Sequence, residues 1–139
     1  MVELTAKEIE RLNQAATLVR DQAYAPHSHF YVGAALLMDD GEIVVGCNVE
    51  NASYSMCLCA ERVAVSTAIS SGYRSWRAIA IASLGGVTPC GACRQFLSEF
   101  GFDLAVVTTD VIDGAYRIHR LDQLLPEAFD ASHLPGHTS

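Results

Sequence analysis

The sequence predicts an α/β fold, a three-layer sandwich in which a mixed sheet of about five strands carries helices on both faces. Three observations support this prediction. Segments of helical periodicity alternate with short, nearly continuous apolar runs, the first two of these runs flank a turn sequence, and half of the residues are apolar while 18% are charged. No repeat, low-complexity tract or interdomain linker interrupts the 139 residues, so one domain, residues 1–139, is expected.

The first element is a helix that begins at Thr5. Thr5 and Glu8 have the spacing of a capping box, in which each residue satisfies a free backbone N–H group at the helix start. Apolar side chains recur at helical spacing from Ile9 to Val19, which predicts one buried stripe on a helix ending near Gln22.

A loop and a β-hairpin follow. The segment AYAPHSHF, residues 23–30, contains a proline and small polar residues, which are typical of a loop. The apolar runs 32–38 and 42–49 flank the turn Asp39-Asp40-Gly41, so two antiparallel strands are predicted.

The rest of the chain alternates helices and strands. A helix from Cys59 is expected to end before Gly72, and a second helix from Cys90 to end at Gly101, because glycine favours the backbone conformation that terminates helices. Apolar and β-branched content predicts strands over 77–83, 104–109 and 115–120, the last near a sheet edge, and residues 121–134 are expected to form a short helix and a tail.

Composition limits the possible partners and compartment. Sixteen acidic and nine basic residues give a net charge of −7 without a basic cluster, so neither a nucleic acid polymer nor a membrane is expected as a partner. No signal peptide or membrane-spanning run is apparent, which predicts a cytoplasmic protein. In that reducing compartment five cysteines indicate metal ligands or buried thiols rather than disulfides.

Two cysteine motifs suggest a metal centre. The motif CAER contains Cys59, and the motif PCGAC contains Cys90 and Cys93. Both motifs fall at predicted helix starts, where the helix dipole and free N–H groups favour the thiolate that zinc binds. Three protein ligands leave one zinc position open for water, as hydrolysis requires.

Two neighbouring residues would complete this chemistry. Glu61 is placed to accept a proton from a water molecule at the open position and to return it to a substrate. Three thiolates on one dication leave a negative site, so Arg62 is expected to donate hydrogen bonds to the sulfurs and restore positive character to the metal.

Other interpretations of these residues remain open. CGAC alone is also typical of a redox pair or half of a structural zinc site, and Glu61 alone of an acid in a first helical turn. A fourth thiolate from Cys57 would close the site and make it structural, but Cys57 would precede the helix start. The combination of CAE with PCxxC favours catalysis because it matches the signature of zinc deaminases.

The motifs resemble a known family over nearly the whole chain. GCNVENASYSMCLCAER (46–62) and TPCGACRQFLSEF (88–100) are similar to the small homotetrameric, zinc-dependent cytidine deaminases of pyrimidine salvage, and 23–37 and 124–129 extend the match. The resemblance implies the deaminase fold, one zinc ion per subunit held by the three cysteines, and proton transfer by Glu61.

The resemblance also implies a substrate site. Phe30 would pack on the pyrimidine, Asn48 and Glu50 would hold the ribose hydroxyls, and Ala60 would contact the base through its main chain; Ala52, Tyr54 and Phe129 would lie near subunit contacts that complete neighbouring sites. The alternation of an extended segment independently places residues 48 and 50 on one side, although the same residues are also compatible with a simple polar turn.

The predicted reaction is hydrolytic deamination of cytidine and 2′-deoxycytidine to the uridine forms, with release of ammonia. The alternatives are a deaminase for another cytosine compound such as blasticidin S, a polynucleotide-editing deaminase, and a structural or storage zinc protein. The linker SLGGVT, residues 83–88, is shorter than the family usually shows, so an altered loop over the site is also expected.

Overall fold

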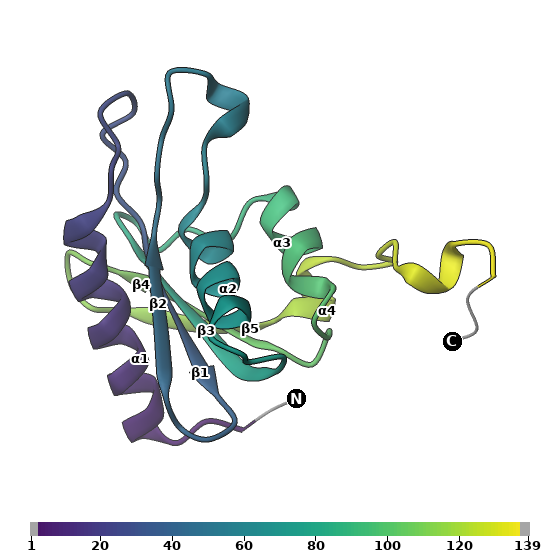
Figure 1. Cartoon of the computed structure of the whole chain (residues 1–139). Helices are drawn as coiled ribbons and strands as arrows, with labels where there is room; N and C mark the ends of the chain where they lie inside the picture. Colours follow the sequence, from purple (N-terminus) through teal and green to yellow (C-terminus); the bar gives the residue numbers. More distant parts are fainter. Residues whose placement is uncertain (1–2, 137–139) are drawn as a thin grey trace.

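A computed structural model describes residues 3–136 and shows a five-stranded sheet between two layers of helices (Figure 1). The strands are β1 Gly33–Met38, β2 Ile43–Cys47, β3 Trp76–Ser83, β4 Ala105–Asp110 and β5 Tyr116–Arg120; the helices are α1 Ala6–Val19, α2 Ala60–Ser70, α3 Gly91–Ser98 and α4 Leu121–Leu124; short 3-10 turns are η1 Arg20–Gln22, η2 Tyr54–Met56 and η3 Ala131–His133. The strand order is β2-β1-β3-β4-β5, with only β3 and β4 parallel. The predicted mixed α/β sandwich is therefore confirmed.

Helix α1 starts as its sequence predicts. The Thr5 side chain accepts a hydrogen bond from the backbone N–H of Glu8 (3.1 Å), and Glu8 accepts one from the backbone N–H of Thr5 (2.9 Å). Both halves of the capping box are thus present. The α-helix ends at Val19, and a 3-10 turn continues the coil to Gln22, which explains why the sequence pattern extends that far.

The β1–β2 hairpin brings a helix close to each face of the sheet. A Cβ atom at Gly33 would lie 1.9 Å from the Ala16 carbonyl oxygen of α1, and one at Gly46 would lie 2.4 Å from the Ala64 nitrogen of α2. Larger residues at either position would therefore push a helix away from the sheet. The glycine in β2 lets α2 pack close to the sheet, so the hairpin determines the distance between α2 and the sheet.

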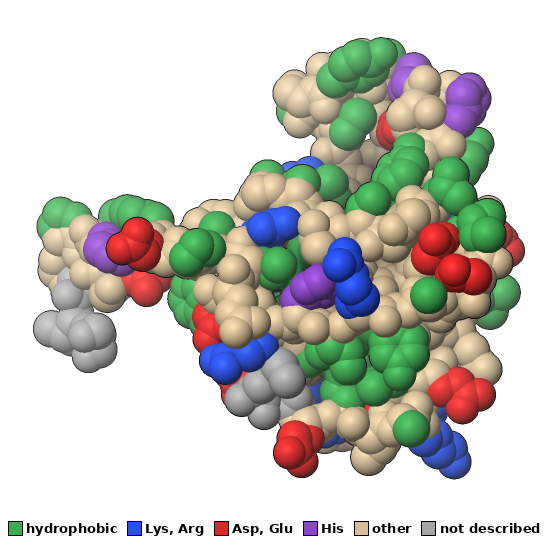
Figure 2. Space-filling view, turned by 180° about the vertical axis from the view of Figure 1, so that it is seen from behind, with side chains coloured by type: hydrophobic (Ala, Val, Ile, Leu, Met, Phe, Trp, Pro, Cys, Tyr) green, Lys and Arg blue, Asp and Glu red, His purple; other side chains and the backbone are tan. Residues whose placement is uncertain are grey.

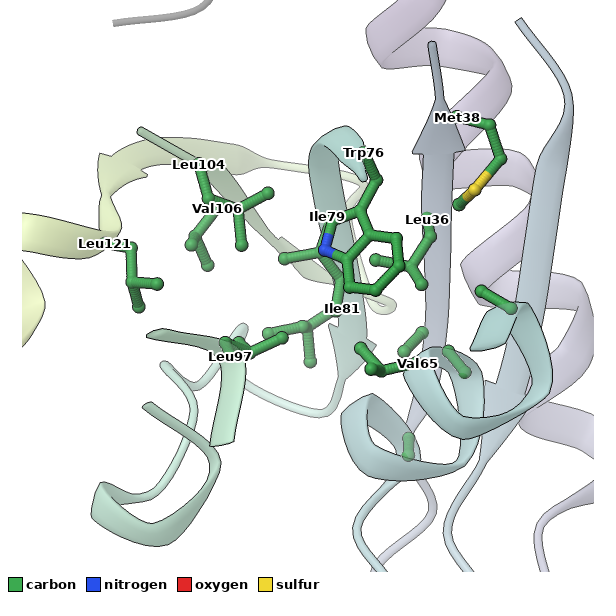
Figure 3. Close-up of a cluster of buried hydrophobic side chains, with 14 residues drawn as sticks. Leu36, Met38, Val65, Trp76, Ile79, Ile81, Leu97, Leu104, Val106 and Leu121 are labelled. Atoms are coloured by element: carbon green, nitrogen blue, oxygen red, sulfur yellow. The ribbon is translucent and has the colours of Figure 1, made fainter. Parts of the chain in front are cut away.

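Two apolar cores stabilise these layers. The core under α2 and α3 contains large side chains such as Leu36, Val65 and Trp76 (Figure 3). The core under α1 is built largely from small alanines of β1, β3 and β4, which permit close helix packing. Cys47, the last residue of β2, is half-buried.

The sheet also determines where a site can form. Gly33 at the start of β1 pairs with Ala82 near the end of β3, so the segments before β1 and after β3 meet at one edge. Helices α2 and α3 begin near this edge, because their N-cap residues Cys59 and Cys90 line one cavity with residues that precede β1 and follow β3. Within residues 3–136, no helix has both the length and the apolar character needed to cross a bilayer.

Candidate active site

Three thiol groups meet where α2 and α3 begin. The sulfur atoms of Cys59, Cys90 and Cys93 all lie within 4.8 Å of one another. Cys59 and Cys90 are the N-cap residues of α2 and α3, and Cys93 lies in the first turn of α3. The CxxC spacing places two sulfurs at one helix start, and the fold adds the third from the other helix. The predicted trio is thus brought together.

The donor set fits a catalytic zinc ion. Three thiolates are a known zinc ligand set, and a fourth, open position is what distinguishes catalytic from structural sites. Cys57 does not join the cluster of Cys59, Cys90 and Cys93. Its sulfur instead accepts a hydrogen bond from the Asn51 backbone N–H (3.3 Å) and donates one to the Asn51 carbonyl (3.6 Å). The geometry therefore argues against a closed four-thiolate site.

The environment favours ionisation of one thiol in particular. A hydrogen bond from Cys93 lowers the pKa of Cys59 to about 5, and hydrogen bonding and charge from Arg62 act in the same direction. The corresponding pKa of Cys93 is raised, first because it shares its proton with Cys59 and then because it is buried. Cys59 is the sulfur at which negative charge is best stabilised.

Arg62 lies against this sulfur as the sequence predicts. Its Nη2 is 3.7 Å from the Cys59 sulfur and donates a hydrogen bond to the Cys57 carbonyl (3.1 Å). The pKa of Arg62 is raised, mainly by its hydrogen bond to Cys59. The guanidinium therefore stays charged beside the thiolate and withdraws negative charge from it.

Glu61 is a buried carboxyl group at the start of α2. Only 4% of the residue is exposed, and burial is the main cause of a raised pKa, with the negative charge of Cys59 adding to it. A buried carboxyl with a raised pKa is typical of groups that exchange protons during catalysis. The position and environment of Glu61 both suit proton transfer.

A cavity of about 260 Å³ opens in front of these groups. Among the predicted site residues, those that line it are Phe30, Asn48, Glu50, Cys59, Ala60, Glu61 and Cys90. Most of its exposed lining is apolar, with a few polar groups, which is typical of a site for a small organic molecule.

Comparison with known proteins agrees with this geometry. Residues 6–109 match the cytidine and deoxycytidylate deaminase zinc-binding region. The chain belongs to this family. A cytidine deaminase of Sporosarcina psychrophila is 44% identical over 129 residues, which cover 91% of this chain and 95% of that protein. A probable cytidine deaminase of Dictyostelium discoideum is 42% identical over 135 residues, covering 94% and 90%.

The fold is shared as well as the sequence. A crystal structure of cytidine deaminase from Burkholderia pseudomallei superposes with a TM-score of 0.84 at 46% identity, covering 91% of this chain and all of that one. The zinc-binding assignment of the family agrees with the cluster of Cys59, Cys90 and Cys93.

Two residues assigned to the sugar from the family motif hold the rim of the cavity. The Asn48 amide accepts a hydrogen bond from the Val32 N–H (2.9 Å) and donates one to the Phe30 carbonyl (2.8 Å). Glu50 accepts hydrogen bonds from the backbone N–H groups of His27 (2.9 Å) and Ser28 (3.1 Å) and from the Ser28 hydroxyl. The hydrogen bonds from Ser28 lower the pKa of Glu50, so a charged carboxylate faces the cavity.

Three residues implied by the family resemblance lie outside this cavity. Ala52 and Tyr54 are exposed on the loop that projects beyond the sheet, and Phe129 is exposed on the C-terminal arm (Figure 1). The chain by itself does not bring them to Glu61. Their predicted role at neighbouring sites stays a prediction.

Sequence reasoning missed several residues of the site. Ser28, Val87 and Thr88 also line the cavity. Ser28 and Thr88 lie inside stretches that match the family but were given no role, and Val87 lies in the short linker. Only the meeting of the 23–30 and 84–90 loops shows that they share the cavity. Leu84, in the short linker, does not cover this cavity but lines a separate hollow beside α1.

That second hollow is larger but chemically poorer. It measures about 960 Å³ and lies between α1 and the segment that joins β4 to β5. No cysteine or histidine is among the described residues that line it. The smaller cavity, with its thiols and buried carboxyl, is therefore the candidate active site of this family member.

Proposed function

We propose that this protein catalyses zinc-dependent hydrolytic deamination of cytidine and 2′-deoxycytidine to uridine and 2′-deoxyuridine, with release of ammonia. The observation that carries the proposal is one cavity lined by the buried Glu61 and by Cys59 and Cys90, two of the three clustered sulfurs. Two similar proteins, the cytidine deaminase of Sporosarcina psychrophila and the probable cytidine deaminase of Dictyostelium discoideum, carry names that support the same reaction.

Cys59, Cys90 and Cys93 would hold one zinc ion per chain. When bound, zinc acts as a Lewis acid that lowers the pKa of water into the neutral range. Arg62 offsets the negative charge of the ligands through its contact with Cys59. Cys59 and Cys90 line the cavity, so a substrate bound there would lie next to these ligands.

Glu61 would move the protons of the reaction. Its carboxylate accepts a proton from the attacking water and delivers it to the ring nitrogen of the pyrimidine. The water oxygen bonds to the ring carbon that carries the amino group, which creates a hydroxyl group there. Glu61 then takes the proton of this hydroxyl and passes it to the amino group, and the C–N bond breaks to release ammonia and leave a carbonyl. Burial keeps this carboxyl away from bulk water, so the proton is handed to the substrate.

The cavity walls would orient the nucleoside. Phe30 offers its ring to the pyrimidine, and Ala60 lines the same wall. Asn48 and Glu50 lie on the cavity at hydrogen-bonding reach of a sugar, although both are partly occupied by the 27–32 backbone. A neutral ribose suits the charged Glu50, whereas a phosphate would be repelled by it.

We also propose a homotetramer in the cytoplasm, with each chain a single domain. Two arms extend from the body of the molecule, and their exposed Tyr54 and Phe129 are 73% and 56% accessible. Figure 2 shows further apolar side chains on both projections. Such surface is expected to be covered by neighbouring subunits, whose arms would complete the sites.

The reaction is tested by replacing Glu61 with glutamine. Glu61→Gln is expected to lower the rate of cytidine deamination by about 10²- to 10⁴-fold while zinc stays bound, because only the proton carrier is lost. Glu99→Gln, an exposed acid at the end of α3, is the matched control and should be unchanged. Turnover is followed by the absorbance change and ammonia release.

The outcomes separate the alternatives. Full activity of Glu61→Gln would contradict the proposed proton transfer. Equal turnover of cytidine 5′-phosphate would contradict the nucleoside specificity, and faster turnover of blasticidin S would move the assignment to a different cytosine compound. Zinc enclosed by four sulfurs, without any ammonia release, would indicate a structural site.

A further inference from the structure

One arginine of α3 joins three separate parts of the chain. Arg94 donates hydrogen bonds from Nε to the Pro89 carbonyl (2.8 Å), from Nη2 to the Thr88 hydroxyl (3.0 Å) and from Nη1 to the Leu124 carbonyl (2.7 Å). The side chain is half-buried, and its planar fork of donors suits several fixed acceptors at once. Arg94 thereby links the loop before α3 to the end of α4.

The first two contacts act on the least supported zinc ligand. The Pro89 carbonyl belongs to the peptide bond that leads directly into Cys90, so a bond to it restrains the orientation of that peptide. Cys90 is exposed and makes no side-chain capping hydrogen bond. By contrast, Cys93 is buried and Cys59 contacts Arg62.

The third contact holds the C-terminal segment. Leu124 is the last residue of α4, and the chain leaves the body of the molecule just beyond it (Figure 1). The next residue of α3, Gln95, donates a hydrogen bond from Nε2 to the Phe129 carbonyl (2.9 Å). Adjacent side chains of α3 therefore hold the segment 124–129 at two points.

We propose that Arg94 is a positioning residue that couples the segment 124–129 to the zinc ligand Cys90. The proposal rests on the zinc site proposed above. One rigid guanidinium bonds to both parts, so ordering of the loop before Cys90 and ordering of the segment 124–129 favour each other. Zinc binding should then tighten the C-terminal segment, and loosening of that segment through Arg94 should weaken zinc binding.

Lysine at this position separates charge from geometry. Arg94→Lys keeps the positive charge but replaces the fork by a single ammonium group, which does not reach the three acceptors in the same way. Arg74 provides a matched control, because it also donates to two backbone carbonyls, those of Ile69 and Tyr73, away from the site. Arg74→Lys should leave every measurement below unchanged.

The first measurement is the zinc affinity, determined by competition between the zinc-loaded protein and a chromogenic chelator. Arg94→Lys is expected to bind zinc about 10- to 100-fold more weakly, as loss of supporting contacts to metal ligands typically produces. Thr88→Val removes only one acceptor and should weaken zinc binding less than Arg94→Lys does. If Arg94→Lys does not fold, Thr88→Val tests the same contact. Gln95→Ala loosens the segment at Phe129 but leaves every contact of Arg94 in place, so its effect on zinc affinity should be much smaller than that of Arg94→Lys.

The second measurement is amide hydrogen exchange over residues 124–129, with and without zinc. Removal of zinc should speed exchange there in the parent chain and should have little additional effect in Arg94→Lys. Unchanged zinc affinity of Arg94→Lys, or equal zinc dependence of exchange in both proteins, would overturn the proposal. Neither readout involves turnover, so failure of the coupling and failure of the proposed deamination are distinguishable.

Discussion

The N-terminus of α1 differs from the N-termini of α2 and α3 in how the free backbone N–H groups of the first turn are used. Thr5 and Glu8 satisfy the first N–H groups of α1 through a complete capping box. The N-cap residues of α2 and α3 are Cys59 and Cys90, and neither makes a side-chain capping hydrogen bond. Replacing a good N-cap typically costs about 1 kcal/mol of stability.

The comparison shows that the starts of α2 and α3 lack a stabilising cap where their cap residues supply sulfur ligands instead. At α1 the cap serves the helix itself, on the face of the sheet away from the candidate active site. At α2 and α3 the cap positions place sulfur atoms together, and the free N–H groups and the helix dipole stabilise thiolates. At α2 and α3, the missing capping hydrogen bond therefore coincides with a cap residue whose side chain serves the cysteine cluster.

The largest expected effect comes from making the start of α2 resemble that of α1. Cys59→Ser introduces a good N-cap but removes a thiolate ligand, and deamination should fall by about three orders of magnitude as zinc catalysis is lost. The zinc-free variant should be more stable than the zinc-free parent by up to about 1 kcal/mol. Zinc content, turnover and denaturant unfolding test this, and full zinc content with normal turnover would contradict it.

A smaller effect is expected from Arg62, which supports the cap residue of α2. Arg62→Gln removes the charge beside Cys59, and activity or zinc affinity should fall by about 10- to 100-fold. The more negative site holds its protons more tightly, so the acidic limb of the pH–rate profile should move to higher pH. An unchanged profile would show that Arg62 does not balance the charge of the thiolates.

At α1 the corresponding change should affect stability alone. Thr5→Ala removes the cap and should lower the free energy of unfolding by about 1 kcal/mol. Zinc content and turnover should not change, because α1 makes no contact with the cysteine cluster. Urea unfolding measures the first expectation, and any loss of zinc would break the proposed separation of the two kinds of helix start.

The smallest effect concerns the pH dependence of the same cap. The Thr5 backbone N–H, followed by Arg77, lowers the pKa of Glu8 below its ordinary value of 4.5. Glu8 therefore contributes stability above about pH 4.5, and the contribution is lost as the pH falls through the lowered pKa. Glu8→Gln should reduce stability at neutral pH by about 0.5 kcal/mol and flatten the acid side of the stability curve.

Local chemistry explains what was predictable. The capping box, the turn at 39–41 and the glycines after α2 and α3 act over a few residues, so the elements they bound were correctly predicted. The motifs around Cys59 and Cys90 are also local, and they predicted Cys59, Cys90 and Cys93 as a metal-binding set, whose sulfurs the structure brings together. The roles assigned to Glu61 and Arg62 stay predictions. Tyr54 and Phe129 could be assigned only through the family resemblance, and the single chain leaves them exposed.

The sequence by itself determined the order of helices and strands and the chemical types of the site, because periodicity, capping and ligand spacing are properties of neighbouring residues. Only the tertiary structure decided that Cys59 meets Cys90 and Cys93, that Ser28 and Thr88 share one cavity, and that Arg94 reaches Leu124 across 30 positions. These contacts depend on how the sheet brings distant loops to one edge. No local pattern records that arrangement.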